Sequence, residues 1–255
     1  MSYKIHVLKG YIQTIYLIEE SNGLFLLDGC CRPDVPTVLD FINKNLHRSV
    51  HDLKLVIATH AHPDHAGGLY FFQKLGIPIA GPVNLNSWYK GISGLIKYLV
   101  DILLTYLVAI IKKQGLKNVF YPRSFRLDYE LKDSDIIPYF GAWCVIETPG
   151  HTALDLSIYH SQTNLIYIAD NFVLSKGKLV HPYPLCYPEK YKISLKKYLD
   201  MEIHKFLLAH YGQIKISKDQ IESLIRSTPK IPRIHRNSLS SILLKLCKGL
   251  LKLGF

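Results

Sequence analysis

Apolar runs with the length and composition of β-strands dominate the N-terminal part of the chain. Residues 3–8, 11–18, 24–29 and 53–58 are rich in aliphatic, β-branched and aromatic side chains. Ser21-Asn22-Gly23 lies between the second and third runs and is typical of a turn. We therefore expect the chain to begin as a meander of strands, followed by a buried strand at 53–58.

Segments with a helical period alternate with further strands in the rest of the chain. We expect helices at 34–46, 69–75, 189–201 and 218–226, and strands at 77–80, 142–147, 154–159, 164–170 and 205–210. Residues 173–180 predict a small hairpin with Gly177 in its turn, and residues 133–138 predict a polar turn. The alternation indicates an α/β fold, with one domain over residues 1–230.

The segment 85–117 predicts a helical insertion, with one long helix over 85–113. Its apolar side chains leave only a narrow polar stripe at Lys97, Asp101 and Thr105. A membrane span is disfavoured, because Lys97 and Asp101 would each cost about 2.5 to 3.5 kcal/mol near the centre of a bilayer. Covering a functional site, forming a homodimer contact, touching a membrane surface and ordinary core packing remain as alternatives that the sequence does not separate.

The tail at 231–255 predicts a basic amphipathic helix. From residue 237 on, leucine and isoleucine side chains recur at helical spacing, with Lys245, Lys248 and Lys252 on the other face. Helices of this kind lie in a membrane interface, and the alternative is that the tail packs on the body of the protein.

The amino-acid composition limits the kinds of binding partner and the cellular compartment that we expect. The formal net charge of +11 favours an anionic partner such as nucleic acid, phospholipid headgroups or an acidic substrate. We find no basic cluster interleaved with aromatic residues, so nucleic acid is the less expected partner.

The five cysteines show no recurrent spacing and are expected to be thiols. The N-terminal residues have no pattern of a secretory signal, so a cytoplasmic protein, peripheral to a membrane in one alternative, is the expectation.

A dense group of metal-ligand residues follows the run 53–58 directly. His60, His62, Asp64 and His65 fall within six positions. Imidazole and carboxylate ligands together suit zinc or another first-row divalent ion. The sequence therefore predicts a metal site at the end of this strand.

Three later strands also end in ligand-type residues, namely His151, Asp170 and His210. An aspartate, Asp28, ends the run 24–29 in the same way. Strand ends that converge at one edge of an α/β sandwich bring such side chains together. The remaining histidines lack this placement and are interpreted as surface or core residues.

This spacing resembles the ligand signature of the metallo-β-lactamase superfamily over residues 3 to 226. The resemblance implies a four-layer αββα sandwich and, most simply, two zinc ions, although iron or manganese accept the same ligands. It assigns the side chains as follows: a first metal at His60, His62 and His151, a second at Asp64, His65 and His210, Asp170 as the bridge, and Asp28 as a residue that orients the ligands.

The resemblance also implies metal-assisted hydrolysis by a metal-bridging hydroxide, with Asp64 orienting that hydroxide and carrying its proton. Asp170 stands where some true β-lactamases have cysteine, so antibiotic hydrolysis is not expected. The favoured substrate is a small molecule, an ester, thioester or lactone with an apolar portion. The alternatives are a phosphodiesterase or nuclease acting on an anionic substrate, and a metal-binding scaffold protein without catalysis.

Overall fold

The structure, a computed structural model, describes residues 3–234, and its strands form two six-stranded sheets and one small hairpin. The first sheet has the order β1-β2-β3-β4-β5-β6. Its strands are β1 (Lys4–Lys9), β2 (Thr14–Glu20), β3 (Gly23–Leu26), β4 (Leu53–Ile57), β5 (Ile79–Pro82) and β6 (Tyr129–Leu131). The predicted N-terminal meander is present as the antiparallel pairs β1–β2 and β2–β3, and β3 to β6 are parallel.

The second sheet has the order β14-β13-β10-β9-β8-β7. Its strands are β7 (Ile136–Ile137), β8 (Phe140–Glu147), β9 (Leu156–His160), β10 (Leu165–Tyr167), β13 (Lys205–Leu208) and β14 (Gly212–Ile214). The predicted hairpin is formed by β11 (Val173–Ser175) and β12 (Lys178–Val180), and Gly177 between them has a φ of +76°.

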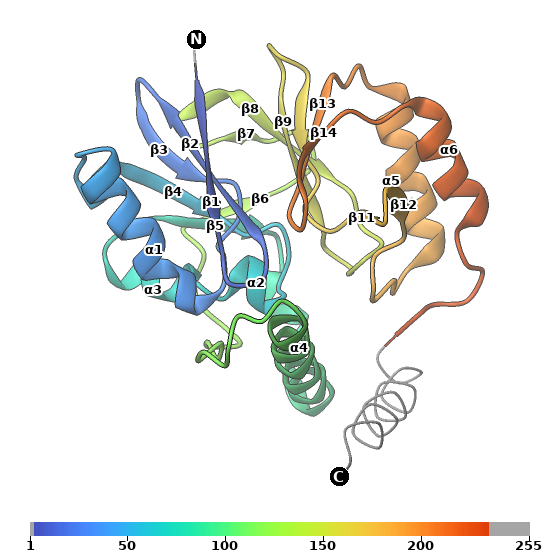
Figure 1. The fold of residues 1–255 in the computed structure, drawn as a ribbon, viewed down its shortest axis with the longest axis horizontal. Coiled ribbons are helices and arrows are strands. Elements are labelled where there is room, and N and C mark those ends of the chain that lie inside the picture. Colours follow the sequence, from blue (N-terminus) through green and yellow to red (C-terminus); the bar gives the residue numbers. More distant parts are fainter. Residues whose placement is uncertain (1–2, 235–255) are drawn as a thin grey trace.

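Helices cover the outer face of each sheet (Figure 1). The α-helices are α1 (Val35–Asp40), α2 (Pro63–Ala66), α3 (Leu69–Lys74), α4 (Gly91–Ile111), α5 (Pro188–Asp200) and α6 (Lys218–Ser227). The 3₁₀ and π turns are η1 (Arg32–Asp34), η2 (Phe41–Asn45), η3 (Val50–Asp52) and η4 (Leu85–Ser87). Helices α1 and α3 lie on the first sheet, and α5 and α6 lie on the second (Figure 1). This arrangement confirms the predicted αββα sandwich.

Three apolar cores separate the four layers, and neighbouring residues of one strand enter different cores. In β2, Leu17 belongs to the core under the first helices, whereas Ile18 belongs to the core between the sheets. In β13, Phe206 packs under α5 and α6, whereas Leu207 faces the other sheet. Because both faces of these strands are buried, the strands have continuous apolar runs rather than an alternating pattern.

The predicted helix over 85–113 begins later than expected. Residues 85–87 form η4, Lys90 is extended, and α4 starts at Gly91, whose φ of +71° ends the preceding turn. The break folds Trp88 and Tyr89 back onto α4, where Lys97 lies 4.5 Å above the Trp88 ring. A left-handed glycine therefore divides a sequence whose apolar period runs through it without interruption.

Other differences from the predicted elements are local. The predicted helix at 34–46 is divided into η1, α1 and the π-helical turn η2. The predicted turn at 133–138 contains the two residues of β7, and β6 and β14 are short strands that we did not expect. The predicted amphipathic tail lies outside the described residues from His235 on. At Arg233 the chain still pairs with Leu185.

Candidate metal centre

The loops that carry the predicted ligands all leave the same edge of the sandwich. His60 and His62 follow β4, and Asp64 and His65 lie on α2 directly after them. The remaining ligand-type residues follow strands of the second sheet: His151 after β8, Asp170 after β10 and His210 after β13. Strands β3 and β4 are parallel, as are β10 and β13, so their carboxyl ends meet at one place.

The backbone at Gly68 helps to hold the ligand loop against β3. A Cβ atom at Gly68 would lie 2.3 Å from the carbonyl oxygen of Gly29. The Gly68 amide donates to the carbonyl of Cys30 at 2.9 Å. Only glycine therefore allows the end of the metal loop to pack this closely against Gly29 and Cys30, which directly follow Asp28.

The seven predicted ligand residues come together in two groups. The ligand atoms of His60, His62 and His151 lie within 4.8 Å of one another, and the same holds for a second group, Asp64, His65, Asp170 and His210. This is the division that the resemblance implies. The structure shows the arrangement, and the assignment of each residue as a ligand remains a prediction.

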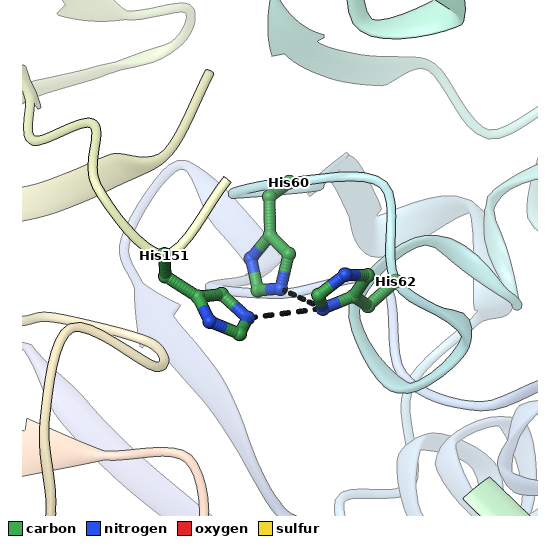
Figure 2. Close-up of side chains that lie close together, drawn as sticks. All are labelled: His60, His62 and His151. Carbon is green, nitrogen blue, oxygen red and sulfur yellow. Dashed lines mark hydrogen bonds between the residues drawn. The ribbon is translucent and has the colours of Figure 1, made fainter. Parts of the chain in front are cut away.

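Three ring nitrogens converge in the first group (Figure 2). His62 Nδ1 lies 3.1 Å from His60 Nε2 and 3.0 Å from His151 Nε2. His151 Nδ1 donates to the carbonyl of Pro184 at 2.6 Å, so its Nε2 carries a lone pair when the ring is neutral. One proton on His62 satisfies at most one of the two contacts, which leaves lone pairs facing each other. A cation bound by all three nitrogens removes this conflict.

His60 is held in the same tautomer by a threonine. The Thr59 hydroxyl donates to Asp28 Oδ2 at 2.8 Å, so Thr59 Oγ1 accepts from His60 Nδ1 at 3.1 Å. The lone pair of His60 is therefore on Nε2, which faces His62.

Asp28 connects this contact to the second group. Its Oδ2 also accepts from His65 Nδ1 at 2.6 Å and from the Tyr167 hydroxyl at 2.8 Å, and its Oδ1 accepts from the Thr59 amide at 2.9 Å. His65 Nε2 consequently faces inward and is buried, 3.5 Å from Asp64 Oδ2 and 3.4 Å from Asp170 Oδ2. Asp28 thus contacts His65 directly and His60 through Thr59, and its role in orienting the ligands stays a prediction.

The second group places two carboxylates against two histidines. His210 Nε2 lies 3.3 Å from Asp64 Oδ2 and 3.2 Å from Asp170 Oδ1, and its Nδ1 donates to the carbonyl of Ile12 at 3.2 Å. Asp170 Oδ2 lies 3.4 Å from His65 Nε2 and 3.7 Å from His151 Nε2. Asp170 therefore stands between the two groups, as a bridging carboxylate would.

Burial and charge give the two groups different protonation. Burial lowers the pKa of His62 to about 4, and it also lowers the pKa values of His60 and His151. Three neutral imidazoles are the form that binds metal. Burial also lowers the pKa of His210, but Asp170 and Asp64 outweigh it and raise that pKa to about 10.

The carboxylates of the second group stay ionised. Burial alone would raise the pKa of Asp64 and of Asp170, but His65 and His210 hold both well below the usual range. Protons on the two histidines thus balance the two carboxylates. A divalent cation competes for the same Nε2 atoms and supplies the same balance, so the donor set fits a metal.

A carboxylate from α4 approaches the site from outside the predicted ligand set. Asp101 is buried, its Oδ2 accepts from the Tyr89 hydroxyl at 2.8 Å, and the same atom lies 3.7 Å from His62 Nε2. In the sequence, Asp101 is recognisable as part of the narrow polar stripe of this helix and as a residue that disfavours a membrane span, but not as a residue of the site. The i, i+4 pair of polar residues Asp101 and Thr105 marks the buried face of α4, although it does not indicate which loop that face contacts.

A small pocket of about 100 Å³ opens over the two groups. Besides ligand residues, its lining is formed by Ile12, Pro63, Asp101, Leu104, Thr105, Val108, Tyr183 and Pro184. A larger hollow of about 540 Å³ lies between Asn22, His51, Lys54 and Tyr139, where no predicted ligand is found. The pocket at the ligand groups is therefore the candidate site, with α4 as one wall.

The comparisons with known proteins agree with this geometry. The family model described as metallo-beta-lactamase superfamily matches residues 8–210, which include all seven predicted ligands. No curated protein matches the sequence. Together with the two ligand groups, the family match supports a metal-dependent hydrolase.

Solved structures show the same fold at low sequence identity. A metallo-beta-lactamase family protein from Thermus thermophilus is 18% identical with a TM-score of 0.64, covering 96% of this chain and 82% of that chain. An archaeal superfamily protein from Sulfolobus tokodaii is 18% identical with a TM-score of 0.62, covering 89% and 88%. A metallo-beta-lactamase from Pontibacter korlensis is 15% identical with a TM-score of 0.59, covering 88% and 100%.

Proposed function

The chain belongs to the metallo-β-lactamase superfamily, and on this premise we propose that it is a binuclear metal-dependent hydrolase of an ester, thioester or lactone with an apolar portion. The observation that carries the proposal is the lining of the pocket over the two ligand groups. Leu104 and Val108 of α4 form an apolar wall beside the ligands, together with Ile12 and Pro184. An acyl chain fits such a wall, because apolar side chains favour apolar surface.

The same lining opposes a phosphodiester. None of the described residues that line the pocket is lysine or arginine, the side chains that usually clamp phosphate oxygens. The wall instead contributes the carboxylate of Asp101, which repels an anion. Within residues 3–234, the lysines and arginines that give the protein its positive net charge therefore contribute no side chain to the lining of this pocket.

The proposal assigns two roles to residues of the site, metal binding by the predicted ligands and proton transfer by Asp64. Seven nitrogen and carboxylate ligands favour zinc, with iron or manganese as metals of the same ligand preference. Bound divalent ions would polarise the substrate carbonyl and lower the pKa of a water toward neutrality. Asp64 lines the pocket as a buried, ionised carboxylate, and we assign to its Oδ2 the orientation of the attacking water and transfer of its proton to the leaving group.

The test is a substrate panel on the full-length protein loaded with zinc. We expect turnover of p-nitrophenyl esters, thioesters or lactones, and little or none of bis-p-nitrophenyl phosphate. His62→Ala and Asp170→Ala should lower bound zinc and turnover together. His204→Ala is the control, because His204 is exposed and contacts Glu202 at 3.1 Å, away from the ligand groups.

Three results would contradict the proposal. Faster cleavage of the phosphate diester than of every ester would make the protein a phosphodiesterase. Absence of activity on every substrate of the panel, with two metals bound to the protein, would favour a scaffold protein. Unchanged zinc content and turnover in His62→Ala would remove the assigned site.

A further inference from the structure

Helix α4 presents an apolar face to the outside of the molecule. Ile92, Ile96, Leu99, Leu103 and Ile110 are all exposed, Ile92 to 81% and Ile96 to 58%. Their spacing of three, four and seven residues places them on one side of the helix. We call these five residues the outer face of α4. A continuous exposed face of large aliphatic side chains marks a surface that binds another protein or a membrane.

The opposite face of α4 holds the helix to the domain. Tyr98, Asp101, Ile102, Thr105 and Ala109 are buried against the rest of the protein. Figure 1 shows α4 at the end of the sandwich beside α2 rather than within a layer. The helix is long and apolar enough to cross a membrane by length and composition, and 33% of that stretch is buried. Because its inner face carries the contacts to the candidate site, α4 is anchored and offers only its outer face.

Exposed lysines precede, interrupt and follow α4 along the chain. Between residues 85 and 126 the chain has seven lysines and arginines and a single acid, Asp101, which is buried on the inner face. Lys90 before α4, Lys97 within it, and Lys113 and Lys117 after it are exposed. The segment therefore combines an apolar strip with exposed cations only, which is the pattern of interfacial helices that bind anionic lipid.

The positive charge of this segment also distinguishes among the candidate binding partners of the outer face: a second copy of the chain, its own C-terminal residues and an anionic surface. In a symmetric pair of chains the same patch meets itself, so the lysines around the two outer faces would approach one another. Residues 235–255 of this chain carry Arg236, Lys245, Lys248 and Lys252 and no acid, so they too have the same sign of charge. An anionic surface has the complementary sign.

We propose that the outer face of α4 docks on the surface of an anionic phospholipid bilayer, with the side chains of this face in the headgroup and acyl boundary and the lysines on lipid phosphates. The proposal is independent of the proposed hydrolytic function, because it concerns binding alone. Helix α4 would then lie between the membrane and the candidate site, with its inner face still on the protein.

The test is co-sedimentation of the full-length protein with vesicles. One set contains phosphatidylcholine alone and the other contains phosphatidylcholine mixed with phosphatidylglycerol. The variant Ile92→Gln/Leu99→Gln/Ile110→Gln removes the apolar face without changing the net charge. Its control is Val7→Gln/Ile136→Gln/Ile193→Gln, in which exposures of 63%, 57% and 62% match the 81%, 49% and 56% of the first set. Circular dichroism and thermal unfolding confirm that both variants are folded.

We expect the wild type and the control to bind the anionic vesicles more tightly than the neutral ones, and the α4 variant to bind about ten-fold or more weakly. Absence of wild-type binding to the anionic vesicles would overturn the proposal. Equal binding of the α4 variant and the wild type would do the same, because another segment would then carry the contact. A dimer in sedimentation velocity that the α4 variant dissolves, without vesicle binding, would assign the face to a second copy.

Discussion

Asp101 is a buried carboxylate on a largely apolar helix, and its charge acts on the neighbouring ring of His62. Its Oδ2 accepts from the Tyr89 hydroxyl and lies on the Nε2 side of His62, at 3.7 Å. A negative charge on that side favours the tautomer of a neutral His62 with its proton on Nε2, which leaves the Nδ1 lone pair for the first metal. The carboxylate therefore acts on the metal through the ring of His62.

Replacing Asp101 by asparagine should weaken metal binding at the first group. The amide has about the same shape but is a weaker, uncharged acceptor, and changes in such supporting residues cost about 10- to 100-fold in metal affinity. A competition titration with a zinc chelator measures the affinity. Asp200→Asn, at an exposed aspartate on α5, is the matched control. Zinc affinity equal to that of the wild type would show that Asp101 does not orient the ligand.

Asp34 is a second buried carboxyl, away from the ligand groups. Its Oδ1 accepts from the Tyr11 amide at 2.7 Å, whereas its Oδ2 is buried without a partner among the described residues. Burial raises the pKa of Asp34 from 3.8 to about 7. The unfolded chain therefore releases this proton at a lower pH than the folded one. The stability that the protonated form provides is lost as the pH rises through about 7.

Asp34→Asn should remove this pH dependence. At about pH 4 the variant and the wild type should have similar free energies of unfolding, and by about pH 8 the variant should be more stable by a few kcal/mol, since each pKa unit corresponds to about 1.4 kcal/mol. Urea unfolding at several pH values measures the difference. Asp40→Asn, at an exposed residue paired with Lys44, should show no such trend. A constant difference between Asp34→Asn and the wild type across this range would contradict the pKa of about 7.

The elements that the sequence predicts well are those in which local pattern and tertiary packing agree. Strands with both faces buried have uninterrupted apolar runs, so β2, β3, β4 and β13 could be recognised without knowing their partners. Six of the ligand-type residues could be recognised for the same reason, because they follow β4, β10 or β13, whereas His151 follows the partly exposed strand β8. The ligand set is predictable because it is tied to strand ends.

Elements whose structure depends on distant contacts could not be predicted. The start of α4 is set by the positive φ of Gly91 and by the contact of Tyr89 with Asp101, neither of which alters the apolar period. Strand β14 has only three residues and exists because it pairs with β13. The approach of Asp101 to His62 joins an inserted helix to a strand-end loop. The spacing of Asp101 and Thr105 places both on one face of the helix, but it does not encode which loop that face contacts. The position of a helix relative to a loop far away in the sequence is determined by tertiary packing.

At the scale of the whole molecule, the candidate centre joins the two halves of the sandwich. In the first group, His60 and His62 come from the first sheet and His151 from the second. In the second group, the first sheet contributes Asp64 and His65, and the second contributes Asp170 and His210. A metal bound to either group therefore connects the two sheets, and its binding energy adds to the stability of the native arrangement.

Removal of metal should lower the unfolding temperature reversibly. A ligand that binds only the folded chain stabilises it by about 4 kcal/mol at a free concentration about 1,000 times its Kd. For a chain of this size that corresponds to roughly 10 °C, at about 2–4 °C per kcal/mol. Differential scanning calorimetry before chelation, after it and after zinc is restored measures the shift.

The variants separate this effect from unspecific action of the chelator. His151→Ala removes the contribution of the second sheet to the first group, so its unfolding temperature should respond less to chelation than that of the wild type. His204→Ala leaves both groups intact and should respond like the wild type. If chelation empties the wild type of metal and its unfolding temperature does not change, the ligands do not connect the two sheets energetically. The metal would then act in chemistry alone, on a scaffold that the three apolar cores already hold in place.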